Sequence, residues 1–220
     1  MPTDIWGLLV QGIGQTLYMV LVSTLCAYVL GIPIGVVLYI TDKTGICPNR
    51  WVNTILGIIV NLLRSIPFII LLIAIIPFTR ALVGTTIGST ATIVPLVVSA
   101  APFVARMVES SLKEVDIGVI EAAESMGSTR FQIIWKVLLP EARPSLIVGA
   151  AIAITTILGY SAMAGFTGGG GLGTIAINYG YYRYDTGVML ITVALLVIIV
   201  QIFQEIGMRI ANRSDKRINK

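Results

Sequence analysis

The chain contains no histidine, only two cysteines and few charged residues. Histidine is the most common metal ligand and general base near neutral pH, so its absence removes the usual routes to metal binding and acid–base catalysis. Cys26 lies within an apolar run and Cys47 in a short polar loop, a spacing that predicts neither a zinc site nor a disulfide framework. We therefore expect no catalytic residues, no metal and no cofactor.

Charged residues make up only 12% of the 220 residues, whereas 56% are hydrophobic. Soluble domains carry about 25% charged residues, so roughly half of the usual polar surface is missing. Several apolar runs reach the roughly 20 residues that a helix needs to cross about 30 Å of hydrocarbon. The composition therefore predicts an all-α polytopic membrane protein, with the lipid bilayer as its first partner.

Five apolar stretches predict five transmembrane helices, at about residues 14–40, 52–76, 89–107, 144–165 and 187–208. No basic residue precedes Lys43, so the first stretch lacks the basic region of a signal peptide and is expected to be a retained span. Basic residues concentrate on the cytoplasmic side of membrane proteins. Placing the N-terminus outside leaves only Arg80 and Arg183 outside and puts twelve basic residues in the cytoplasm: Lys43, Arg50, Arg106, Lys113, Arg130, Lys136, Arg143, Arg209, Arg213, Lys216, Arg217 and Lys220.

This asymmetry predicts an external N-terminus and a cytoplasmic C-terminus. The net charge of +4 then requires only an anionic inner leaflet, and nucleic acid is not implied.

A polar segment at about residues 113–143 separates the third and fourth spans, and its apolar residues recur at helical spacing. Asp116 is predicted to cap a first short helix, and Gly127 to end it in a left-handed conformation. The apolar face of that helix is predicted to contain Val119, Ile120, Ala123 and Gly127.

A second short helix is predicted to restart at Thr129, through a capping box with Gln132, and to stop at Pro140. One face of it is expected to carry Phe131, Ile134, Trp135 and Leu138. Such a helix suits the bilayer interface, where aromatic side chains insert. It equally suits a groove on a soluble partner, and the residues alone leave these two alternatives about even.

The same segment contains Glu121-Ala122-Ala123, then Gly127 after three residues, then Val137-Leu138-Leu139-Pro140 after nine more. This pattern resembles the signature loop E-A-A-x3-G-x9-[I/V]-x-L-P of permease subunits of bacterial ATP-binding-cassette (ABC) importers. The stretches 158–165, 170–173 and 179–181 are similar to those of the methionine-uptake permeases. The likeness covers essentially the whole chain, which implies a single transmembrane permease domain over residues 1–220.

The resemblance implies a coupling role for eight residues of this loop: Glu121, Ala122, Ala123, Gly127, Phe131, Trp135, Leu139 and Pro140. It also implies three kinds of protein partner in the bacterial plasma (inner) membrane. These are a second copy of the permease, two cytoplasmic ABC ATPase subunits and an extracellular or periplasmic substrate-binding protein, often a lipoprotein. The implied substrate is D- and/or L-methionine, with another small amino acid or an osmolyte as the alternative.

The sequence contains no Walker A lysine loop, so we expect ATP to be hydrolysed on a separate subunit and the chain itself not to be an enzyme. A dinucleotide fingerprint occurs formally within 168–173, but it follows a predicted span instead of a strand, and a flexible outer loop is the simpler reading.

Candidate pathway or gate residues are Arg64, Tyr160, Ser161 and Met163. Arg64 is a charge well inside a predicted span, where it costs at least about 3 kcal/mol unless it is satisfied. It is therefore expected either to lie at the membrane interface, or to reach carbonyls freed by Pro67 or face the pathway near its cytoplasmic gate.

Two other classes of function were weighed. A secondary transporter typically places ionisable groups inside the membrane, yet the predicted spans contain no Asp or Glu, except beyond residue 204. A membrane enzyme would need an acid–base constellation, and the clustered carboxylates lie only in the polar segment. Both classes are therefore disfavoured.

Overall fold

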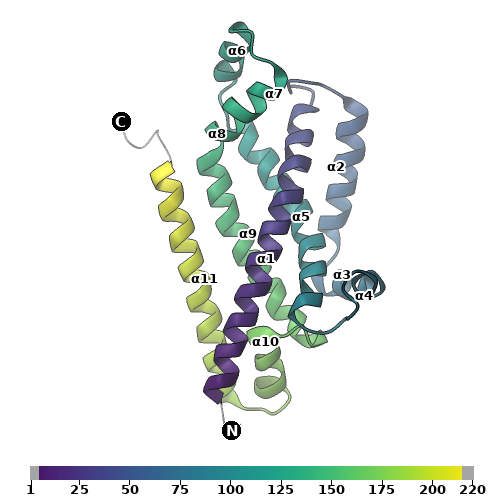
Figure 1. Ribbon diagram of the computed structural model, residues 1–220, viewed down its shortest axis with the longest axis vertical. Helices are drawn as coiled ribbons and strands as arrows, with labels where there is room; N and C mark the ends of the chain where they lie inside the picture. The colour runs from purple at the N-terminus through teal and green to yellow at the C-terminus, as the bar shows by residue number, and fades with distance from the viewer. Residues whose placement is uncertain (1–4, 215–220) are drawn as a thin grey trace.

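A computed structural model describes residues 5–214, and all regular secondary structure within that range is helical. Four helices there are long and apolar enough to cross a membrane, and they run along the long axis of the molecule (Figure 1). They are α1 (Ile5–Ile40), α5 (Ser89–Lys113), α9 (Arg143–Met163) and α11 (Thr186–Ser214). The most extensive packing joins α1 to α5, which places the core of the bundle between them.

Three predicted spans proved too short, the last of them because α11 continues from residue 208 to Ser214. Helix α1 begins at Ile5 instead of residue 14, because the apolar pattern continues through the N-terminal residues and buries Leu9. Helix α5 runs on from residue 107 to Lys113, and neither Pro95 nor Pro102 ends it. Prolines are tolerated there because neighbouring helices enclose the backbone groups that they free.

The close approach of α1 to α5 depends on Gly35. A Cβ atom at this position would lie 2.5 Å from the carbonyl oxygen of Ala105 and 2.6 Å from Cβ of Val108. Small residues at a helix crossing let backbones approach in this way. Gly35 therefore serves packing in this structure.

The span predicted at 52–76 is not one straight helix, because the chain breaks at Pro67. Helix α2 (Arg50–Ser65) ends there, and α3 (Phe68–Ala74) leaves at an angle of 100° to it. Proline lacks an N–H group and forces the preceding residue out of the helical region, and Ile66 is extended, with φ −80° and ψ 123°. Five spans are present only if this bent pair counts as one.

Short helices gather at both ends of the bundle (Figure 1). One end carries α6 (Ile117–Ser125), α7 (Arg130–Gln132) and α8 (Leu139–Glu141). The other end carries α10 (Gly171–Ile175), and α4 (Ile76–Val83) lies beside α3 towards that end. Three basic residues used to predict the orientation lie outside the described residues: Lys216, Arg217 and Lys220.

Candidate functional site

The polar segment between α5 and α9 folds as two short helical units, as predicted. Asp116 caps α6, because its Oδ1 atom accepts a hydrogen bond of 2.7 Å from the backbone N–H of Gly118. Helix α6 ends at Ser125 and is followed by Gly127, whose φ of 76° is left-handed, and the backbone N–H of Ser128 donates to the carbonyl of Ala123. A Cβ atom at Gly127 would meet nothing within 4 Å, so its backbone conformation, not lack of space, demands glycine.

The second unit restarts through the predicted capping box. The backbone N–H of Gln132 donates to Thr129 Oγ1 at 3.4 Å, and the backbone N–H of Thr129 donates to Gln132 Oε1 at 2.8 Å. Two otherwise unpaired donors are satisfied reciprocally in this way. The break at Gly127 and the restart at Thr129 together fix the corner between the two units.

The predicted apolar face of the second helix is present only in part: Phe131 and Trp135 share an exposed side, whereas Leu138 lies on the buried side. Residues 133–138 form a π-helix, η1 (Ile133–Leu138), in which side chains five positions apart share a side. Ile133 and Leu138 are therefore 1% and 0% exposed, whereas Phe131 and Trp135 are 69% and 59% exposed. The ring centroids of Phe131 and Trp135 lie 6.1 Å apart on the exposed side of the second unit.

Pro140 does not stop the helix, which corrects another prediction. The π-helical hydrogen bond from the N–H of Leu139 to the carbonyl of Ile134 ends η1, and α8 begins directly afterwards with Pro140 in its first turn. Proline is tolerated in a first turn because its missing N–H would have no intrahelical partner there. Wider π-helical winding thus lets the chain pass a proline and continue into α9.

Exposure within the segment separates the eight predicted coupling residues into two groups. Ala123 is buried and Leu139 is half-buried, so these two support the fold of the segment. The exposed members are Glu121, Ala122, Gly127, Phe131, Trp135 and Pro140. Sequence reasoning missed Met126 and Ile117, whose exposed apolar side chains border the same helices. Val119, predicted on the apolar face of the first helix, is 40% exposed.

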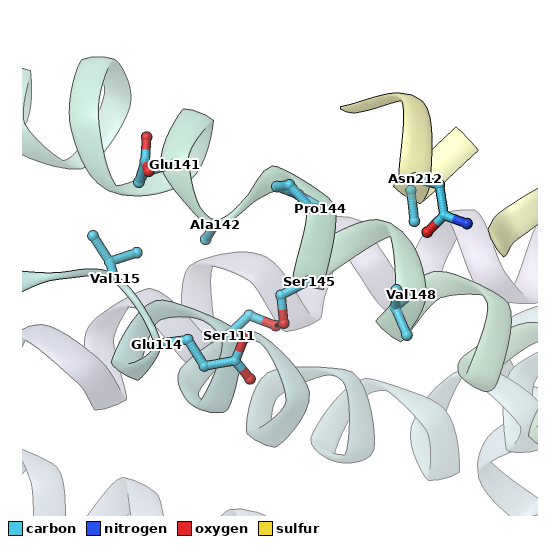
Figure 2. A pocket seen from close by; sticks show the side chains of 10 residues that line it. Ser111, Glu114, Val115, Glu141, Ala142, Pro144, Ser145, Val148 and Asn212 are labelled. Atoms are coloured by element: carbon cyan, nitrogen blue, oxygen red, sulfur yellow. Dashed lines mark hydrogen bonds between the residues drawn. The ribbon is translucent and has the colours of Figure 1, made fainter. Parts of the chain in front are cut away.

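A cavity of about 360 Å³ lies where the segment joins the spans (Figure 2). Residues of α5, α8, α9 and α11 line it, including Asn212, together with Glu114 directly after α5. At its floor the hydroxyl of Ser145 on α9 donates to Ser111 Oγ on α5 at 3.0 Å, and both side chains point toward each other in the figure. The polar segment is thereby anchored to both spans that it connects.

The four candidate pathway residues lie on α2 and α9. Arg64 is exposed in the last turn of α2, at the end remote from α6, with its guanidinium carbon 5.9 Å from the ring centroid of Phe103. That position does not support the expectation of a gate on the α6 side. Tyr160 is half-buried, Met163 is 48% exposed, and Ser161 is buried and donates to the carbonyl of Leu158.

The glycine-rich stretch after α9 was expected to be a flexible loop and is instead ordered. Gln15 Oε1 accepts from the backbone N–H of Gly171 at 2.7 Å, and Thr16 Oγ1 accepts from Leu172 at 2.9 Å. These polar side chains of α1 hold the start of α10 against the bundle. Side chains so distant in sequence supply the order that composition alone does not predict.

Residues 27–220 match the family described as "Binding-protein-dependent transport system inner membrane component". The chain is 52% identical to the "Probable D-methionine transport system permease protein MetI" of Vibrio cholerae over 96% of this chain and 93% of the relative. It is 54% identical to the D-methionine transport system permease protein MetI of Escherichia coli K12, over 72% and 73% of the two chains.

Two solved structures extend the likeness to three dimensions. A chain of the inward-facing MetNI methionine ABC transporter superposes with a TM-score of 0.96 at 50% identity, covering 98% of this chain and 100% of that one. A chain of an amino acid ABC transporter solved with histidines superposes with a TM-score of 0.77, covering 94% of each chain. Its identity of 19% shows a shared fold only.

Proposed function

The chain belongs to the family of binding-protein-dependent transport system inner membrane components, and from that premise we propose that it is the permease subunit of an ABC importer for methionine. The observation that carries the proposal is near full-length identity to D-methionine permeases, joined to a fold that superposes on a methionine transporter. We propose that the whole chain acts as one permease domain in the inner membrane, with its N-terminus outside and the α6 end in the cytoplasm.

The proposed assembly contains two copies of this chain, two cytoplasmic ATPase subunits and a substrate-binding protein on the outer side. Each ATPase subunit would receive one polar segment in a surface groove. Exposed Phe131 and Trp135 support this docking, because apolar anchors at helical spacing suit such a groove. In the proposed division of labour, this chain supplies the pathway and the ATPase subunits hydrolyse ATP.

We propose that the methionine pathway runs past Arg64 on α2 and past Tyr160 and Met163 on α9. An arginine within a span typically faces a bundle interior or a water-filled path, and its guanidinium suits a substrate carboxylate. Met163 and the aromatic rings nearby are compatible with a thioether side chain. Replacing Arg64 by Gln should raise the KM for methionine more than replacing it by Lys, and equal KM values would contradict this placement.

Reconstituted transport tests the proposal. The permease, its ATPase and its binding protein in proteoliposomes should accumulate labelled methionine only with ATP, and the purified permease alone should hydrolyse none. A competition panel that includes both methionine enantiomers defines the substrate. If glutamine or a basic amino acid competes about tenfold better, roughly 1.4 kcal/mol in apparent affinity, the methionine assignment is wrong although the permease class stands.

A further inference from the structure

A buried carboxylate lies in α5 where the sequence had predicted the span to have ended. Glu109 is 7% exposed. Its Oε2 atom lies 2.6 Å from Nη1 of Arg106, one turn earlier, and its Oε1 atom lies 2.9 Å from Nζ of Lys113, one turn later. A buried charge of this kind is costly unless both of its oxygens are paired, and here each oxygen has its own cation.

Each of the two cations also reaches a second segment of the chain. Nη2 of Arg106 donates to the carbonyl of Gly57 at 3.2 Å and to Oδ1 of Asn61 at 3.0 Å, both on α2. Nζ of Lys113 lies 2.9 Å from Oδ2 of Asp42, in the loop that leads from α1 to α2. Through its two cations, Glu109 thus joins α5 to α2 and to that loop.

The same cluster borders the polar segment. Lys113 is the last residue of α5, and only residues 114–116 separate it from α6. Lys113 also lines a cavity of about 310 Å³ whose wall includes Ile120, Glu121 and Glu124 of α6. A displacement of α6 therefore reaches the end of α5 over a very short piece of chain.

We propose that Glu109 is a positioning residue which, through Arg106 and Lys113, makes α2, α5 and the loop at Asp42 follow α6 as one unit. This inference rests on the proposed function, because the movement it transmits is the one imposed on α6 by the ATPase. Without the buried carboxylate, α6 still docks and α5 still spans the membrane. What is lost is the ion pair that holds Arg106 in place against α2, on which Arg64 of the proposed pathway lies.

The chain offers a matched control on α11. Glu205 pairs with Arg209 at 2.6 Å one turn later, but both side chains are largely exposed and, among residues 5–214, the pair joins α11 to no second element. Glu205→Gln therefore removes a carboxylate of the same kind from a helix, without removing a link between elements. Glu109→Gln keeps nearly the same shape, but it removes the charge and replaces one accepting oxygen with an NH2 donor beside a cation.

The test compares both variants in the reconstituted complex, with methionine imported per ATP hydrolysed as the readout. Wild type and Glu205→Gln should give the same ratio. Glu109→Gln should assemble with the ATPase yet lower the ratio at least about fivefold, the lower end of typical coupling between distant sites. Asp42→Asn breaks only the link to the loop, so it should lower the ratio by a smaller factor.

The outcomes separate the two proposals. If wild type imports no methionine, the proposed function fails, whatever the variants do. If wild type imports methionine and Glu109→Gln keeps its ratio, or lowers transport and hydrolysis in parallel, the carboxylate is merely structural and the inference is overturned. If Glu109→Gln does not assemble, the Asp42→Asn variant becomes the test. Its partner Lys113 is half-exposed, and the substitution leaves the Glu109–Lys113 pair intact. An unchanged ratio of methionine imported per ATP in Asp42→Asn overturns the inference.

Discussion

Phe68 and Tyr160 stack face to face, with ring centroids 4.7 Å apart and ring planes inclined by only 4°. Phe68 is the first residue of α3, directly after the break in the second span, and Tyr160 lies in the last turns of α9. The stack therefore fixes the short helix α3 against a long span, next to the proposed pathway.

Removing the Tyr160 ring should loosen this contact. Aromatic pairs contribute about 0.5–1.5 kcal/mol beyond the area that they bury. We expect Tyr160→Leu to lower thermal stability in detergent and to reduce methionine uptake, whereas Tyr160→Phe, which keeps the ring, should retain both. If Tyr160→Phe loses uptake at full stability, the hydroxyl and not the stack is the important group.

Gly127 should tolerate asparagine better than valine. A side chain costs about 1–2 kcal/mol in the left-handed region, but asparagine visits that region routinely and a β-branched residue does not. We expect Gly127→Val to insert normally in the membrane while losing co-purification with the ATPase, and Gly127→Asn to retain it. Equal assembly and uptake by both variants would show that the corner at Gly127 plays no part in docking.

Substitutions of exposed and of buried side chains in the second unit should have different effects on docking and on stability. Replacing Phe131 and Trp135 together by serine should weaken association with the ATPase and leave the thermal midpoint of the isolated permease unchanged. Leu138→Ala should do the reverse, since a buried leucine truncation costs about 2–5 kcal/mol. Thermal unfolding and co-purification of the same preparations distinguish the two; loss of stability in the serine variant would contradict the exposed placement.

The contribution of Asp42 to the stability of the protein should be lost at acidic pH. Its hydrogen bonds with the side chain of Lys113 and the backbone of Lys43 hold its pKa below the usual value of 3.8. A carboxyl whose folded pKa is depressed stabilises the protein fully above the unfolded value and loses that contribution as the pH falls through the folded value. The thermal midpoint of wild type should therefore exceed that of Asp42→Asn at neutral pH, and the two should converge only below about pH 3.9. A constant difference down to lower pH would contradict this.

The proposed orientation is open to labelling. In a variant without Cys26 and Cys47, a cysteine at Thr85 should react with a membrane-impermeant reagent in whole cells, because Thr85 lies in the turn after α4, away from α6. A cysteine at Glu124 on α6 should react only after the membrane is opened. The opposite pattern would invert the topology.

Local chemistry predicted the polar segment well. Asp116, Gly127, Thr129 and Gln132 each act within a few residues of their own position, so their roles are readable from spacing. The buried side of the second unit could not be predicted from the sequence. Because η1 is a π-helix, residues that share a side are five positions apart instead of three or four.

Predictions failed where distant parts of the chain decide the structure. Gln15 and Thr16 hold a glycine-rich stretch that lies 156 positions away in the sequence, and no local sequence pattern predicts these contacts. Glu109 was missed for a related reason. Hydropathy alone ended the predicted span at the first charged residues. In the structure, Arg106 and Lys113 neutralise Glu109, so α5 continues beyond residue 107.

The break at Pro67 has a consequence for the lipids around the protein. Helix α2 contains 16 residues, so it extends about 24 Å, whereas the hydrocarbon core measures about 30 Å. Acyl chains solvate no unpaired carbonyls, and the last turn of α2 leaves such groups without helical partners. Lipid tails therefore cannot surround the whole of this side of the chain. Beyond Ser65 the surface must be covered by a second copy of the chain or wetted by water. The lipid-facing surface of the assembled importer therefore does not include this part of the chain.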